Sequence, residues 1–185
     1  RPEARLWVVA DGMGGHSAGD VASRMIAERF TELDLPEGLS LCRFSEADDS
    51  QAARIGELLG TGLSGDNHPF ATLNTALLAE GVFVAIADGA DLEQPLELLW
   101  LVRAAERPTA INQRLLVRAG RNSRASLVEH FCALEAAQPS FTNGVSELLL
   151  EDGKRLAHYR LQEEGHGAAH IGSVHASLQR DAHLS

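Results

Sequence analysis

The chain has 185 residues, of which 44% are hydrophobic and 5% aromatic, and its formal net charge at pH 7 is −10. This length fits one domain or two small ones, with a core built mainly from Leu, Val and Ala. The negative charge disfavours binding to nucleic acid or to an anionic membrane surface. Two cysteines exclude a disulfide framework. No apolar run is long enough to span a bilayer and no signal peptide is recognised, so we expect a cytoplasmic protein.

The N-terminal segment is predicted to be a short α/β unit. Residues 6–10 form an apolar strand, residues 11–19 a glycine-rich turn, and a helix begins near Asp20. Asp11 ends the strand and precedes three glycines within four positions. A carboxylate on such a turn is suited to bind a hard cation such as Mg²⁺ or Mn²⁺. The alternative is an ordinary Asp-Gly turn that leads into a helix.

Residues 31–67 are predicted to be mostly connection. The acidic stretch 46–50 is expected to stay solvated, and a short helix spans about residues 50–59. A second helix is expected over residues 69–79.

From Gly81 onward the pattern predicts strands separated by turns. These are expected at residues 82–86, 96–102, 114–118, 126–134, 145–150, 156–162 and 170–178. Several of them alternate, so that Tyr159 and Leu161 share one face and His158 the other. Two strand pairs resemble each other at an offset of 33 residues, measured from Gly120 to Gly153. Such recurrence fits a stacked β solenoid or a β sandwich.

Six of the eight histidines lie between residues 130 and 183: His130, His158, His166, His170, His175 and His183. Imidazole suits transition metals, so a metal site is one interpretation. The other is structural, in which His158 and His175 face solvent or a neighbouring coil. We expect Cys132 to be a small buried hydrophobe and not a cluster ligand.

The string from Trp7 to His16, with residues 19–23 after it, resembles the PPM-type metal-dependent Ser/Thr protein phosphatases over about residues 5–42. The resemblance implies that Asp11 bridges two metal ions (Mn²⁺ or Mg²⁺) and that Gly12 offers its carbonyl to one of them. The later carboxylates of that family do not recur in order, since Asp66 precedes Asp88. One carboxylate cannot hold two cations, so we predict no phosphatase activity and no catalytic residue.

A second resemblance runs from about residue 45 to residue 185. It rests on the segments 68–77, 81–84, 89–98, 125–131, 156–162, 170–171 and 179–181. These segments are similar to the SufB/SufD family of iron–sulfur cluster assembly proteins, and more to SufD than to SufB. The resemblance implies a right-handed parallel β-helix and a scaffold without enzymatic chemistry. It also implies SufB and SufC homologues as partners, with an iron–sulfur cluster held only through those partners.

The sequence therefore predicts a mainly β chain in which a partial right-handed parallel β-helix follows a short α/β segment. Its parts are a phosphatase-like fragment (1–43), a linker with short helices (44–80) and a SufBD-like fragment (81–185). The preferred function is a truncated SufD-like scaffold. The alternatives are an inactive phosphatase fragment and a product with neither activity. The sequence leaves both origins of the joined fragments open, a genuine fusion or an artefact. Because the β-helix is incomplete, we also expect self-association through its open end.

Overall fold

The computed structural model describes residues 5–11, 35–63, 68–78, 80–102, 109–133 and 140–185. Strands dominate these residues, which confirms the prediction of a mainly β chain. The strands are β1 (Arg5–Asp11), β2 (Leu39–Arg43), β3 (Glu80–Ile86), β4 (Leu96–Val102), β5 (Thr109–Ile111), β6 (Gln113–Ala119), β7 (Arg124–Ala133), β8 (Ser140–Leu150), β9 (Arg155–Glu163), β10 (Ala169–Leu178) and β11 (His183–Leu184). The helices are α2 (Asp49–Leu58), α3 (Pro69–Ala76) and a short 3-10 turn, Phe44–Glu46.

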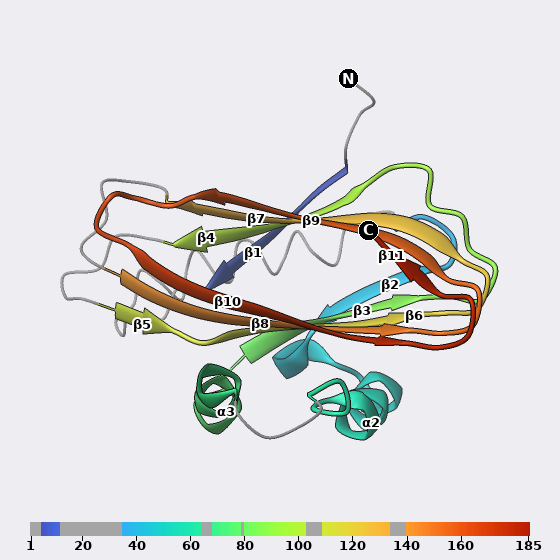
Figure 1. Ribbon diagram of the computed structural model, residues 1–185, viewed down its shortest axis with the longest axis horizontal. Coiled ribbons are helices and arrows are strands. Elements are labelled where there is room, and N and C mark those ends of the chain that lie inside the picture. Colours follow the sequence, from blue (N-terminus) through green and yellow to red (C-terminus); the bar gives the residue numbers. More distant parts are fainter. Residues whose placement is uncertain (1–4, 12–34, 64–67, 79, 103–108, 134–139) are drawn as a thin grey trace.

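The strands form two stacked sheets, seen edge-on in Figure 1. The upper sheet has the order β1-β4-β7-β9-β11, and the lower sheet the order β10-β8-β6-β3-β2, with β5 beside β8. From β3 to β11 the chain passes repeatedly between the two layers, with the consecutive strands β5 and β6 both in the lower one. Its strands pair in parallel, whereas β2 pairs with β3 in the antiparallel sense. Because these neighbouring strands pair in parallel within each sheet, the array differs from an antiparallel sandwich.

Four stacked turns return the chain from the lower sheet to the upper one. They comprise residues 87–90, 120–123, 151–154 and 179–182, and in each the fourth N–H donates to the first carbonyl. The third residue of each turn has a positive φ, and these residues are Gly89 (74°), Asn122 (53°), Gly153 (68°) and Asp181 (57°). Gly, Asn and Asp tolerate this left-handed conformation best, so local turn chemistry marks every repeat. The N–H of each third residue except the last donates to the next turn, which holds the stack together.

A continuous apolar core fills the space between the sheets. Val84, Val117 and Leu148 point into it from the lower sheet, and Leu98 and Leu127 from the upper one. A smaller apolar cluster lies on the outer face of the lower sheet, where α2 packs. Asp48 precedes α2 and forms a capping box with Gln51. The Asp48 side chain accepts from the backbone N–H of Gln51, and the Gln51 side chain accepts from the backbone N–H of Asp48.

Most predicted elements are confirmed, with three differences. Residues 39–43 were expected to be connection, but they form β2 because their apolar side chains complete the lower sheet beside β3. The short strand β5 was also missed. The repeat is 31 residues at β6 and β8, where Arg114 pairs with Val145, and not 33. Gly153 occupies the turn position of Asn122, so matching it to Gly120 misplaced the register.

The two described strands of residues 1–43 join the sheets formed by the later chain, β1 beside β4 and β2 beside β3. The predicted boundaries at residues 43 and 80 stay predictions. None of the helices in the described part of the chain has the length and apolar character that a membrane-crossing helix needs.

Candidate functional site

A buried ion pair joins the helices to the outer face of the lower sheet. Arg114 on β6 donates to Glu147 on β8 at 2.5 Å, and neither side chain is exposed to solvent. Arg114 also donates to Asn74 and Thr75 of α3, at 3.0 and 2.5 Å. Burial lowers the pKa of Arg114, and the nearby Glu147 opposes this shift. The guanidinium therefore has a partner on both the sheet and the helix.

The loop after α2 is held by the same carboxylate. Glu147 accepts from the backbone N–H groups of Gly60 (2.9 Å) and Gly62 (3.2 Å). Asn74 adds two bonds to sheet carbonyls, those of Gln113 (2.9 Å) and Asn143 (2.7 Å). Each bond satisfies a polar group that would otherwise be buried without a partner. This cluster positions the helices and contains no nucleophile paired with a base.

A second polar cluster lies between the sheets. Oε1 of Glu129, on β7, accepts from Ser146 at 2.7 Å and from Arg160 at 3.1 Å, and it lies 2.9 Å from Nε2 of His158. Burial would raise the pKa of Glu129, but the bond from His158 and the charge of Arg160 lower it below its usual value. Glu129 is therefore held as a carboxylate in the interior, and the His158 tautomer that carries the Nε2 proton fits this geometry.

Aromatic contacts extend this cluster towards β10. The guanidinium of Arg160 lies 5.6 Å from the ring centroid of Phe131, which stacks on Trp100 and meets His170 edge-on at 4.7 Å. Nδ1 of His170 lies 2.7 Å from Glu164. Burial would raise the pKa of Glu164, but the bond to His170 lowers it. The cluster thus ties three strands of the upper sheet to β10, and we assign it a structural role.

Of the two metal ligands predicted near the N-terminus, Asp11 and Gly12, only Asp11 belongs to the described residues. Asp11 is the last residue of β1, whose backbone pairs with β4. Gly12 lies outside the described residues, so the predicted phosphatase-like ligand pair remains untested.

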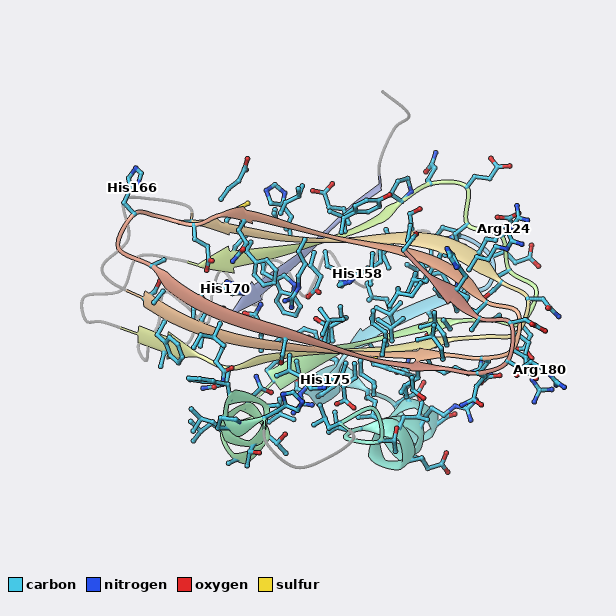
Figure 2. The ribbon with its side chains drawn as sticks, viewed as in Figure 1. Arg124, His158, His166, His170, His175 and Arg180 are labelled. Carbon is cyan, nitrogen blue, oxygen red and sulfur yellow. The ribbon has the colours of Figure 1, made fainter. Side chains whose placement is uncertain are left out.

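The C-terminal histidines do not form one site. Figure 2 shows His158 and His170 between the sheets, His175 on the helix side of the lower sheet and His166 in an outer turn. His158 contacts a neighbouring coil through Glu129, as expected. His175 instead meets His68 edge-on, with ring centroids 4.9 Å apart. His130 lies on the outer face of the upper sheet beside Cys132, which is only partly buried, so the prediction of a buried Cys132 is wrong.

Sequence reasoning missed the charged residues that organise both clusters. Glu129 lies in a strand whose other residues are mostly apolar, and Glu147 directly precedes the apolar run 148–150. This placement of a charged residue is the signal that could have identified them. Their partners, Arg160 and Arg114, lie on different strands, so only the register brings each pair together.

Comparisons with known proteins show similarity over the part of the chain that contains Glu129 and Glu147. Residues 101–185 match the family described as SUF system FeS cluster assembly, SufBD core domain. The chain is 28% identical over 148 residues to an iron–sulfur cluster assembly SufBD family protein of Synechocystis, covering 76% of this chain and 32% of that protein. It is 27% identical to the chloroplastic protein ABCI7 of Arabidopsis thaliana (75% and 30% covered). It is 30% identical to a SufBD family protein of Porphyra purpurea (74% and 28% covered).

The chain therefore spans about a third of the length of these curated relatives. The family match covers β5 to β11, together with the last two residues of β4. It includes both Glu129 and Glu147. Residues 101–185 thus carry a SufBD-family domain, and the chain is similar to SufB/SufD-type proteins.

Proposed function

We propose that this chain contributes to a SufD-like scaffold for iron–sulfur cluster assembly and performs no chemistry of its own. The observation that carries the proposal is that the SufBD core match falls on the stacked parallel strands after residue 100. In this proposal the strands are coils of a right-handed parallel β-helix. The described polar clusters support a structural role, because their charged groups bond to one another and to the backbone.

The proposed partners are homologues of SufB and SufC, and an iron–sulfur cluster would be held through them. The similarity to SufD in particular rests on the resemblance of the segments between residues 68 and 181.

Co-expression with affinity-tagged SufB and with SufC tests this proposal. We expect the untagged chain to elute with SufB, and full-length SufD to compete with it for the same complex. Circular dichroism of the purified chain shows whether it is folded. If the folded chain elutes with tagged SufB in no greater amount than it elutes with the affinity tag alone, a scaffold role is contradicted.

The phosphatase alternative rests on the glycine-rich motif alone, since the family match lies outside residues 5–42. We expect no manganese-dependent hydrolysis of p-nitrophenyl phosphate. Turnover that is abolished by Asp11→Ala would favour that alternative instead.

A further inference from the structure

Three side chains with metal-binding atoms meet on the outer face of the upper sheet. His130 and Cys132 are two positions apart on β7, so both point to the same face. Glu163, the last residue of β9, pairs with Cys132 in register. The imidazole, thiol and carboxylate therefore come from two adjacent parallel strands, whose spacing of about 4.8 Å brings their side chains within reach of a single ion.

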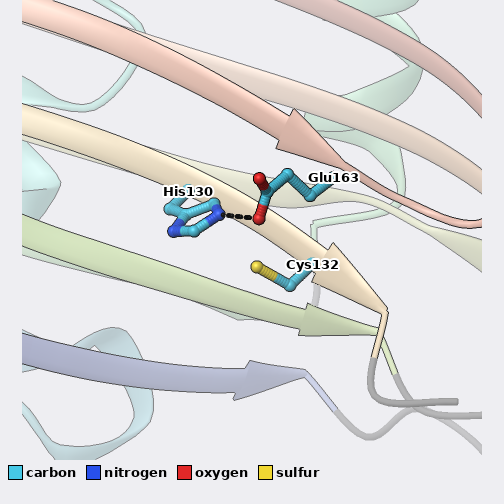
Figure 3. Close-up of side chains that lie close together, drawn as sticks. All are labelled: His130, Cys132 and Glu163. Atoms are coloured by element: carbon cyan, nitrogen blue, oxygen red, sulfur yellow. Dashed lines mark hydrogen bonds and ion pairs between the residues drawn. The ribbon is translucent and has the colours of Figure 1, made fainter.

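The geometry of these groups is compact. One ligand atom from each of His130, Cys132 and Glu163 lies within 4.8 Å of the other two. Nε2 of His130 is 2.9 Å from Oε2 of Glu163, and a dashed line marks this contact in Figure 3. The side chain of His130 is 18% exposed and that of Glu163 is 72% exposed. A hydrated ion can therefore approach the cluster from the solvent.

A fourth residue orients the imidazole. Oε1 of Glu97, on β4, lies 2.9 Å from Nδ1 of His130, and its side chain is 22% exposed. In metal sites the second ring nitrogen of a histidine ligand commonly donates to a carboxylate, which fixes the tautomer and the ring plane. Glu97 is placed for this role, because it leaves Nε2 turned towards Glu163.

We propose that His130, Cys132 and Glu163 bind one divalent transition-metal ion of the Zn²⁺, Fe²⁺ or Co²⁺ type, with Glu97 as the residue that positions His130. A thiolate and an imidazole favour these ions over Mg²⁺ and Ca²⁺, which prefer oxygen ligands. Three protein ligands leave a coordination position for water. The ion would replace the direct contact between Nε2 and the Glu163 carboxylate. This site goes beyond the scaffold function, because it requires no partner protein.

Titration of the untagged, metal-free chain with Co²⁺ tests the proposal. We expect one Co²⁺ per chain and a thiolate-to-cobalt charge-transfer absorption, which Zn²⁺ abolishes by displacing Co²⁺. Cys132→Ser should remove the absorption, and His130→Gln should weaken binding by at least about tenfold. Glu97→Gln should weaken it by about tenfold, the lower end of the usual effect of such an outer partner.

Cys42→Ala is the matched control, since this second cysteine is buried in the apolar cluster below the lower sheet. It should leave Co²⁺ binding unchanged. Circular dichroism tests whether each variant is folded. Cys132→Ala is measured beside Cys132→Ser, so that the test does not depend on the folding of one variant. Alkylation of wild-type Cys132 by iodoacetamide should also slow at least about tenfold with Zn²⁺. Absence of the charge-transfer absorption in the wild-type chain, or its persistence in both Cys132 variants, would overturn the proposal whatever the partner capture shows.

Discussion

Replacement of Glu147 by alanine should be among the most damaging single substitutions in the lower sheet. The change leaves the buried Arg114 guanidinium without its counter-charge, since both side chains are fully shielded from solvent. It also removes the acceptor of the Gly60 and Gly62 N–H groups. Breaking a buried pair by removing one partner costs about 3–5 kcal/mol, and an unsatisfied buried donor costs about 1–3 kcal/mol.

A loss of about 4 kcal/mol is large for a domain whose total stability is about 5–15 kcal/mol. Urea unfolding followed by circular dichroism measures it. With a slope of about 2 kcal/mol per molar urea, the unfolding midpoint should fall by roughly 2 M. Hydrogen exchange at Gly60 and Gly62 should accelerate as well, because their N–H groups lose the carboxylate that accepts from them.

Two variants separate the lost pair from a general effect of mutation. Asp152→Ala removes an exposed carboxylate that pairs with Arg180, so it should cost less than about 1 kcal/mol. The double variant Arg114→Met/Glu147→Met should be more stable than Glu147→Ala alone, because no buried charge is left without a partner. If Glu147→Ala costs no more than Asp152→Ala, the ion pair does not anchor the helices as argued.

Two further predictions concern the turn stack. Lys154 is fully buried, and its Nζ has no hydrogen-bond partner among the described residues. Burial lowers its pKa from 10.5 to about 8, and the charge of Asp91 opposes this shift. The unfolded chain therefore binds more protons between pH 8 and 10.5, so stability should rise over this range by up to about 3 kcal/mol. Lys154→Met should abolish that rise in urea unfolding at pH 8 and 10.5, and an equal rise in the variant would contradict the assignment. Gly153→Ala should cost about 1–2 kcal/mol, because φ is +68° and the added methyl would meet the Asn122 side chain. Gly165→Ala, where a methyl has open space, is the control, and equal thermal stability of the two variants would refute the argument.

The sequence alone predicted much of the fold because its signals are local. Alternating apolar residues identified the strands that became β9 and β10, and Gly, Asn and Asp marked the turns between crossings. Even so, alternation did not say which face is buried. In β9 the apolar Tyr159 and Leu161 are 57% and 48% exposed, whereas His158 points inward to Glu129.

The sequence by itself determined where most of the strands and turns lie and that the later chain resembles SufB/SufD proteins, since these properties depend on short segments and their order. Only the tertiary structure decided which strands are neighbours, and with them the register that pairs Arg114 with Glu147 and groups His130 with Cys132 and Glu163. Strand pairing joins residues about 30 positions apart, and a shift of one residue would turn each side chain to the opposite face. That choice depends on how the whole stack packs, so no local pattern in the chain encodes it.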